Sequence, residues 1–146
     1  MPPPGQLLHA LIAVLTATLG FIADWNHTHV YNPRWPPHAK FHNGQTMSTG
    51  LLLGGTALFH LFVRPLANPR DNLNVVSWIL CLNYVAQVSA VFYPGSLPID
   101  PEFAGGPGGA FPQAYGAAVL VGVVGVGYWL EEARIRRLEG NVVKAK

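Results

Sequence analysis

The sequence predicts an all-α integral membrane protein: a four-helix up-down bundle with a long outer first loop rich in His and Trp. Half of the 146 residues are hydrophobic and only 11% are charged, whereas about a quarter are charged in a soluble domain. The chain therefore has too few charges to cover a globular surface. Four apolar runs approach the length of a bilayer span. No segment alternates with period two over the length of a barrel strand, which excludes a membrane β-barrel.

The four runs are the predicted spans of a single membrane domain that covers residues 1–146. They comprise residues 7–23, 47–63, 73–93 and 114–130. The first run is near the lower limit for crossing the hydrocarbon core, because a helix rises about 1.5 Å per residue. A cleaved signal peptide is the alternative for this run. No basic segment precedes it and no small-x-small site precedes Asp24, so we expect a retained helix.

Lys and Arg are distributed unequally between the two sides of the predicted bundle. The outer loops hold only Arg34 and Lys40, whereas the second loop and the C-terminal tail (131–146) hold Arg64, Arg70, Arg134, Arg136, Arg137, Lys144 and Lys146. Basic residues favour the cytosolic side, so we expect both termini in the cytosol. The sequon Asn26-His27-Thr28 would then lie on the outer side. It follows the first span so closely that we expect poor glycosylation of Asn26, or none.

Three further features narrow the class of protein. The net charge is only +2 and no basic patch is interleaved with aromatic residues, so nucleic acid is not an expected partner. A single cysteine, Cys81, excludes an intrachain disulfide, and its apolar surroundings predict a buried thiol. Four glycines of the last span are expected to let it pack closely against a neighbouring helix. They are Gly116, Gly122, Gly125 and Gly127.

The second helix carries the longest pattern of polar residues. Pro36 and Pro37 suit a helix start, because the first turn needs no backbone N–H. If the helix runs from there through the second span, six residues share a stripe within about 60° of arc: His38, His42, Gln45, Thr49, Thr56 and His60. Such a stripe is expected to face the bundle interior or a cavity. Asn43-Gly44 is the place where this helix would break.

Two other spans also carry polar residues at helical spacing. The first has His9, Thr16 and Asp24, and the third has Asn83 and Gln87 as i, i+4 neighbours. Together with the second helix they predict a polar pocket that opens toward the outer loops. The structural alternative is that each Asn, Gln or Thr joins helices by hydrogen bonds, that His9 is interfacial, and that the loop aromatics form a membrane belt.

The histidine cluster predicts one of two chemistries. His38 and His42, spaced i, i+4 on a helix, can bind one metal ion. His27, His29 and Asp24 would add ligands to a set that suits iron, copper or zinc, although a di-iron site would be short of ligands. Without metal, Asp24 would donate a proton, a histidine would return it, and aromatic faces would stabilise a carbocation. The residues leave these two chemistries about equal.

The run DWNHTHVYNPRWPPHAKFHNGQTMSTG, residues 24–50, resembles a family of small four-span fungal membrane proteins. Some members accompany polyketide or hybrid natural-product pathways, and some are labelled epoxidases. The resemblance covers most of the chain. It implies a tailoring enzyme of secondary-metabolite biosynthesis that acts on a hydrophobic intermediate of polyketide or terpenoid type. The positions that it marks are Asp24, Asn26, His29, Asn32, Trp35, His38, His42 and Gln45.

A weaker architectural similarity is to the emopamil-binding and sigma-2-receptor-like proteins, which include sterol isomerases that work by proton transfer. It consists of an acidic residue that ends the first span and a long aromatic first loop. The chain lacks the further intramembrane acids expected of that group, and its spans carry His, Asn and Gln instead.

Our first hypothesis is epoxidation of a hydrophobic substrate in the endoplasmic reticulum or another endomembrane, with other enzymes of the same pathway as partners. Asp24, His29, His38 and His42 would surround the reacting centre, and the three histidines would hold iron or copper if a metal is used. The expected substrate pocket comprises Asn26, Asn32, Trp35, Gln45, Thr49, His60, Asn83 and Gln87. The alternatives are a metal-free acid–base isomerase, cyclase or epoxide-opening hydrolase, and a non-catalytic membrane protein that binds a hydrophobic ligand.

Overall fold

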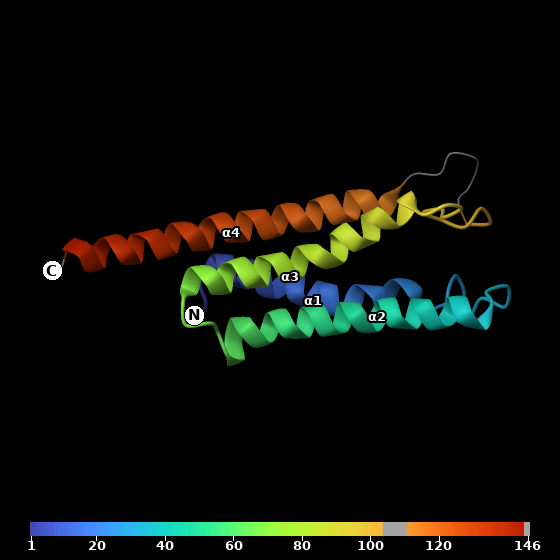
Figure 1. Cartoon of the computed structure of the whole chain (residues 1–146), viewed down its shortest axis with the longest axis horizontal. Helices are drawn as coiled ribbons and strands as arrows, with labels where there is room; N and C mark the ends of the chain where they lie inside the picture. The colour runs from blue at the N-terminus through green and yellow to red at the C-terminus, as the bar shows by residue number, and fades with distance from the viewer. Residues whose placement is uncertain (104–110, 145–146) are drawn as a thin grey trace.

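A computed structural model describes residues 1–103 and 111–144, and in them the predicted all-α four-helix bundle is confirmed. Residues 104–110 of the third loop and Lys146 of the tail lie outside the described residues. The long helices are α1 (Pro4–Asp24), α2 (Pro37–Leu58), α3 (Pro69–Ser89) and α4 (Pro112–Lys144). A short π-helix, η1 (Phe59–Val63), continues α2, and a 3₁₀ turn, η2 (Ala90–Phe92), continues α3. Successive helices run antiparallel, and both termini lie at the same end of the bundle (Figure 1).

All four long helices are long and apolar enough to cross a membrane. Each begins at a proline, whose missing N–H is no loss in the first turn and whose fixed φ suits a helix. The predicted start of α2 at the Pro36-Pro37 pair is thereby confirmed, and Asn43-Gly44 does not break it. The last helix continues past the predicted limit at residue 130 to Lys144, so most of the tail is a helical extension of the span.

Small residues set the close approach of α1 and α2. A Cβ on Gly50 would lie 2.8 Å from the carbonyl oxygen of Thr16. A Cβ on Gly54 would collide with the carbonyl oxygen of Ala13 and lie 2.8 Å from the backbone nitrogen of Ala17. Membrane helices pack mainly by van der Waals contact, so glycines at this seam bring the two backbones together. The buried core next to the seam contains Ile12, Ala13, Ala57, Leu61, Val76, Leu80, Tyr84, Ala117 and Val124.

The predicted packing role of the α4 glycines is confirmed only at Gly127. A Cβ there would lie 2.9 Å from the His9 ring and 3.2 Å from the Gly5 carbonyl oxygen, both of α1. At Gly116, Gly122 and Gly125, no atom of the described residues outside the local helix backbone lies within 4 Å of the Cβ position. The prediction is wrong for these three because they lie on the exposed face of α4, away from the rest of the bundle.

The interior contains two polar pairs that join α1 to α3. His9 Nδ1 donates to the Gly5 carbonyl oxygen at 2.8 Å, so in the neutral ring Nε2 accepts from the Ser77 hydroxyl at 2.8 Å. Thr16 donates to the Ile12 carbonyl and therefore accepts from the Tyr84 hydroxyl, again at 2.8 Å. His9 is only 1% exposed, so its side chain lies inside the bundle and not on its surface. It is held inside because Ser77 and Gly5 satisfy both ring nitrogens.

The polar stripe of α2 faces the opposite way from the prediction. The buried face of α2 contains Met47, Gly50, Gly54 and Ala57, and the stripe residues His38, His42, Gln45, Thr49 and Thr56 are exposed. The glycine seam takes the interior face because it permits the close contact with α1. Thr49 and Thr56 donate to carbonyl oxygens four residues earlier, at 2.8 and 2.7 Å, so their outward hydroxyls keep a partner.

Candidate functional site

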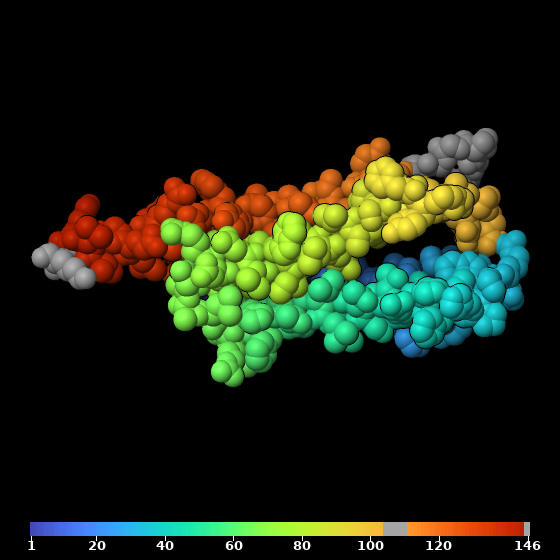
Figure 2. All heavy atoms as spheres, viewed as in Figure 1, coloured from blue at the N-terminus to red at the C-terminus, as the bar shows by residue number. Residues whose placement is uncertain are grey.

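A cavity of about 480 Å³ lies at the end of the bundle opposite the termini. We call this end the cap: the first loop (25–36), the described part of the third loop (93–103), and the adjoining helix ends. In Figure 2 the molecule is hollowed at this end between α2 and the last turns of α3. The lining residues come from all of these segments: Ala23, Asp24, Thr28, His29, Trp35, Gln87, Ala90, Val91, Ser96, Leu97, Pro98, Ile99, Asp100, Phe103, Phe111 and Gln113.

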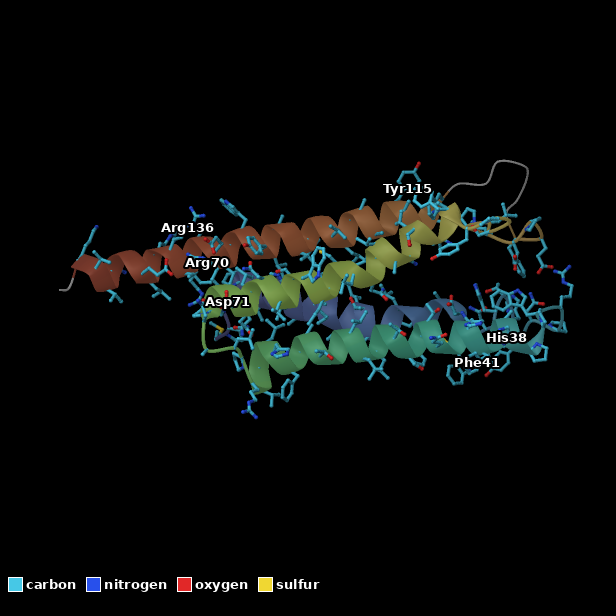
Figure 3. The ribbon with its side chains drawn as sticks, in the orientation of Figure 1. His38, Phe41, Arg70, Asp71, Tyr115 and Arg136 are labelled. Carbon is cyan, nitrogen blue, oxygen red and sulfur yellow. The ribbon has the colours of Figure 1, made fainter. Side chains whose placement is uncertain are left out.

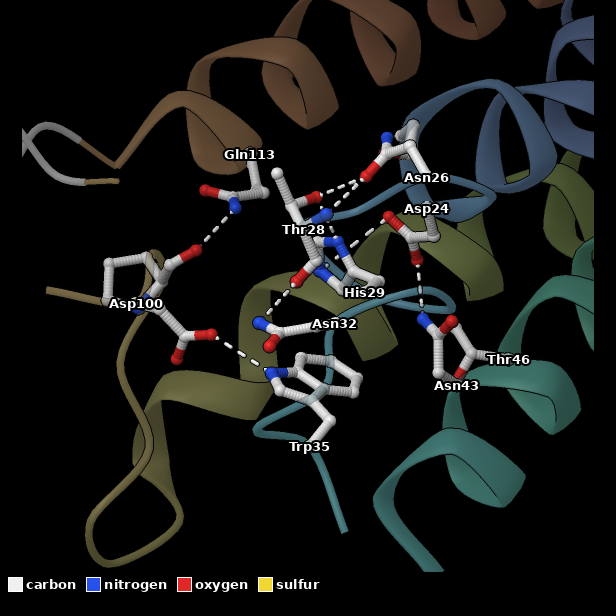
Figure 4. A network of polar contacts seen from close by, with 12 residues as sticks. Asp24, Asn26, Thr28, His29, Asn32, Trp35, Asn43, Thr46, Asp100 and Gln113 are labelled. Carbon is white, nitrogen blue, oxygen red and sulfur yellow. Dashed lines mark hydrogen bonds and ion pairs between the residues drawn. The ribbon is translucent and has the colours of Figure 1, made fainter. Parts of the chain in front are cut away.

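Asp24 and His29 form the polar centre of the cavity wall. Asp24 is the last residue of α1, and its Oδ2 accepts from the Asn43 side chain of α2 at 2.7 Å. Its other carboxylate oxygen, Oδ1, is 3.8 Å from His29 Nε2 (Figure 4). Both side chains are partly shielded, with 21% of Asp24 and 34% of His29 exposed. The pair is therefore accessible from the cavity without being fully solvated.

A chain of hydrogen bonds fixes which nitrogen of His29 carries a proton. The Thr28 hydroxyl lies 2.6 Å from Asn26 Oδ1 and 2.7 Å from His29 Nδ1. The amide oxygen of Asn26 can only accept, so Thr28 donates to it and must accept from Nδ1–H of His29. In the neutral ring, Nε2 then presents its lone pair toward Asp24. The sequon of Asn26 and Thr28 thus serves in the structure as an Asx-type turn that orients His29.

Contacts between the first and third loops hold the cap together. The indole nitrogen of Trp35 donates to Asp100 Oδ2 at 3.1 Å, and its ring packs edge-on against His29 with centroids 4.8 Å apart. Asn32, only 2% exposed, donates to Glu102 Oε1 at 3.2 Å. Glu102 also pairs with Arg34. Trp35 and Asn32 therefore hold in place the part of the cavity wall that contains His29.

The structure brings some of the expected site residues together and separates others. Asp24, His29, Trp35 and Gln87 line the cavity, while Asn26 and Asn32 brace its loop. His38, which Figure 3 labels, instead forms an exposed cluster with His42 and Gln45 on the outer turns of α2. The remaining pocket candidates, which are Thr49, His60 and Asn83, are not among the lining residues.

The exposed α2 cluster has its own geometry. His38 Nε2 and His42 Nε2 are 3.0 Å apart, and His42 Nδ1 lies 3.1 Å from Gln45 Oε1. Within residues 1–103 and 111–144, no three His, Cys, Asp or Glu side chains are grouped to hold a metal ion. The expected triad of His29, His38 and His42 is therefore not assembled, because Thr28 turns His29 toward Asp24. His38 and His42 alone can offer two nitrogen ligands to a transition metal.

The third loop and the start of α4 contribute wall residues that the sequence did not predict. They include Asp100, Phe103, Phe111 and Gln113. Irregular loops rich in Gly and Pro have no periodicity from which a face can be inferred. The one sequence feature that could have marked this loop as part of the site is its charge, because Asp100 and Glu102 are the only charged residues in it.

The fold and the cavity define a class: a four-helix membrane protein whose loops build a polar, partly enclosed cavity at one end. The chain belongs to the family of unknown function DUF6640, whose model matches residues 8–142. The match includes every residue that lines the cavity. No curated protein and no solved structure matches the chain. The family carries no assigned activity, so any functional conclusion has to come from the site itself.

Proposed function

We propose that this protein is a membrane enzyme that transfers protons at carbon, by double-bond isomerisation or proton-initiated cyclisation of a hydrophobic substrate. His29 and Asp24 are the acid–base pair. The observation that carries the proposal is the orientation of His29. Its Nδ1–H donates to the Thr28 hydroxyl, which in turn donates to Asn26, so the lone pair of Nε2 faces Asp24 at the cavity wall. A histidine whose basic nitrogen lies beside a carboxylate can share one proton with it, so the pair can both accept and return a proton.

The reaction requires no oxidant. In isomerisation, His29 Nε2 takes a proton as one C–H bond breaks, the electron pair shifts along the substrate, and Nε2 returns the proton to a second carbon. In cyclisation, the protonated pair first adds a proton to an alkene carbon, a C–C bond closes the ring, and the base removes a proton from a neighbouring carbon. In both cases Asp24 stabilises the imidazolium, and Trp35 presents an aromatic ring to positive charge in the cavity.

The cavity suits a hydrophobic small molecule in size and composition. Its volume of about 480 Å³ lies within the usual range for ligand sites. Apolar groups surround the polar pair, among them Val91, Leu97 and Ile99. The hollow between α2 and α3 supports entry of substrate from within the bilayer (Figure 2). We propose a polyketide- or terpenoid-type substrate, in keeping with the resemblance of residues 24–50.

The orientation in the membrane is part of the proposal. The end with the termini carries most of the Lys and Arg residues, and basic residues favour the cytosolic side. We therefore propose cytosolic termini and a lumenal cap, in the endoplasmic reticulum or another endomembrane. Enzymes that supply or consume the substrate would then share the same membrane.

A second candidate function is oxidation of the substrate to an epoxide. The 3.0 Å approach of His38 Nε2 to His42 Nε2, with Gln45 positioned to accept from His42 Nδ1–H, favours it. Iron or copper would need further ligands besides this pair. Epoxidation would also need dioxygen and a two-electron donor, because one oxygen atom enters the alkene and the other leaves as water.

Isotope incorporation separates the two candidates even while the substrate is unidentified. Purified protein in lipid nanodiscs is incubated in D₂O with the lipid-soluble extract of its native cells, and products are analysed by mass spectrometry. Because the proton held by His29 or Asp24 exchanges with D₂O during turnover, isomerisation or cyclisation leaves a solvent deuterium on carbon, whereas epoxidation under ¹⁸O₂ adds ¹⁸O. We expect deuterium incorporation with wild type and no ¹⁸O.

The variants test the assigned residues. Asp24→Asn can still accept from Asn43, and His29→Gln keeps a polar side chain, so both should fold and lose deuterium incorporation by about 10²-fold or more. His60→Gln, in η1 at the end of the bundle opposite the cap, is the matched control and should retain wild-type rates. Equal rates in wild type and His29→Gln would refute the proposal. ¹⁸O incorporation that depends on His38 and His42 would establish the second candidate instead.

A further inference from the structure

We infer that the substrate is a β,γ-unsaturated ketone or aldehyde and that Gln87 binds its carbonyl oxygen. The inference rests on the proposed function, because it names the substrate class and a further catalytic residue for the reaction at His29. It follows from what a histidine base requires of a C–H bond, and from the hydrogen-bonding groups of the cavity wall.

The chemistry of the base limits the substrate. Imidazole is a mild base, and it removes a proton from carbon only where the electron pair left behind can move onto an electronegative atom. A C–H bond beside an isolated double bond offers no such atom. A carbonyl group on the same carbon does, because the pair then enters a dienolate whose negative charge lies on oxygen. The base His29 therefore requires a carbon that lies between a carbonyl group and the double bond.

The charge that develops on the carbonyl oxygen needs a hydrogen-bond donor in the cavity wall. Most of the donors there are already engaged. The hydroxyl groups of Thr28 and Ser96 and the indole N–H of Trp35 donate to other protein groups. Gln113 Nε2 donates to the Pro98 carbonyl oxygen at 2.6 Å, which turns its amide toward the third loop.

Gln87 is the lining residue whose amide remains available. It lies in the last turn of α3 and lines the cavity together with Asp24 and His29. Its side chain is exposed, and its amide makes no hydrogen bond to the described residues. An amide in a membrane span commonly joins two helices by hydrogen bonds, and Gln87 joins none of the described helices. A ligand carbonyl would give its Nε2 an acceptor.

The base and the donor belong to different elements around the cavity. His29 follows the end of α1, whereas Gln87 belongs to the part of α3 that borders the hollow next to α2 (Figure 2). A ligand held between them presents its oxygen to Gln87 and its neighbouring carbons to His29. Val91 and Leu97 line the same cavity and would contact the hydrocarbon part of the ligand.

The reaction then balances without a co-reactant. His29 Nε2 takes a proton from the carbon between the carbonyl group and the double bond, and that C–H bond breaks. Its electron pair forms a new C=C bond to the carbonyl carbon, and the carbonyl π pair moves to the oxygen, where Gln87 Nε2–H donates to it. The oxygen pair then returns, the double bond moves into conjugation, and the γ-carbon takes the proton from Nε2.

The test treats the lipid-soluble extract with sodium borohydride, which reduces ketones and aldehydes to alcohols and leaves isolated double bonds intact. Wild-type protein in nanodiscs is then incubated in D₂O with reduced or mock-treated extract. A protein-free sample corrects for the exchange of α-hydrogens that ketones undergo without an enzyme. We expect deuterium on the γ-carbon of a conjugated ketone or aldehyde from the mock-treated extract, and none from the reduced extract.

The variants compare two amides of α3. Gln87→Met keeps the length of the side chain and removes the donor, so labelling should slow by about 10²–10³-fold. Asn83→Leu removes an amide one turn away that does not line the cavity, and it should label like wild type. If Gln87→Met fails size-exclusion chromatography, Gln87→Glu supplies the same test, because its carboxylate accepts and cannot donate. A wild-type rate in the folded Gln87 variant, or an equal loss in Asn83→Leu, would overturn the inference.

Failure of this inference can be told apart from failure of the proposed function. Labelling that survives borohydride and still depends on His29 would remove the carbonyl substrate and leave the enzyme. An absence of labelling by wild type in both extracts would remove the enzyme and this inference with it.

Discussion

The glycine seam between α1 and α2 gives a quantitative prediction for Gly54→Ala. A Cβ at this position collides with the Ala13 carbonyl oxygen and lies 2.8 Å from both the backbone nitrogen and the Cβ of Ala17, whereas ordinary Cβ contacts begin at 3.4 Å. The difference, 3.4 − 2.8, is 0.6 Å, and the obstacles are mainly backbone atoms of a helix. Relief therefore requires α1 and α2 to move apart as units, which weakens the contacts along the whole seam.

The adjacent Gly55 supplies the matched control. Outside the local helix backbone, no described atom lies within 4 Å of a Cβ built there. Both substitutions gain the helix preference of Ala over Gly, about 1 kcal/mol. Their difference therefore isolates the steric cost, for which overpacking data indicate about 1–3 kcal/mol. We expect Gly54→Ala to be less stable than Gly55→Ala by that amount, or about 5- to 150-fold in the unfolding equilibrium.

The measurement is unfolding of each purified variant by SDS in mixed micelles, followed by near-ultraviolet circular dichroism. Far-ultraviolet spectra recorded before the titration should show the same helix content in both variants. Equal stability of Gly54→Ala and Gly55→Ala would refute the close approach of α1 and α2 at this seam.

Three further predictions address the interior, the site and the orientation. Ser77→Ala should lower the free energy of unfolding by about 1–3 kcal/mol in the same SDS assay, because His9 Nε2 loses its hydrogen-bond donor inside the bundle. Ser89→Ala should lower it much less, because the Ser89 hydroxyl bonds only to its own helix. Thr28→Val should lower deuterium incorporation at least tenfold by releasing the His29 tautomer, whereas Thr18→Val, on the exposed side of α1, should have no effect. A C-terminal tag should be cleaved by protease added to sealed microsomes, and its protection would contradict the proposed cytosolic termini.

The helices were predictable because apolar length and proline starts are local properties of the chain. Residue spacing also predicted that the polar groups of α2 share one stripe, but it did not predict which way that stripe faces. The prediction assumed that polar groups avoid lipid. In the structure, Thr49 and Thr56 satisfy their hydroxyls within α2, and the inward face goes to Gly50 and Gly54. The small volume of the glycines therefore determines which face of α2 points inward. Polar periodicity alone carries no information about this volume.

The candidate site was only partly accessible from sequence for a different reason. Asp24 lies at a helix end and His29 soon after it, so their proximity to the membrane boundary follows from the chain alone. The orientation of His29 depends on the Thr28 hydroxyl, which bonds both Asn26 and the His29 ring. In the sequence, Asn26 and Thr28 indicate only a glycosylation sequon. The contribution of Asp100 depends on how a Gly- and Pro-rich loop folds back, and no residue pattern specifies that path.

The satisfied and unsatisfied polar groups are distributed unequally along the bundle. Three polar residues of α1 point inward at successive depths: His9, Thr16 and Asp24. His9 and Thr16 have their hydrogen bonds completed by α1 and α3. Three buried side-chain oxygens have no donor among the described residues, and two of them, on Asn43 and Gln113, lie beside the Asp24 end. The third, on Glu131, lies beside a cavity of about 40 Å³, room for a water molecule. The bundle therefore pairs its deep polar groups, and the cavity proposed as the site lies beside Asp24, at the cap.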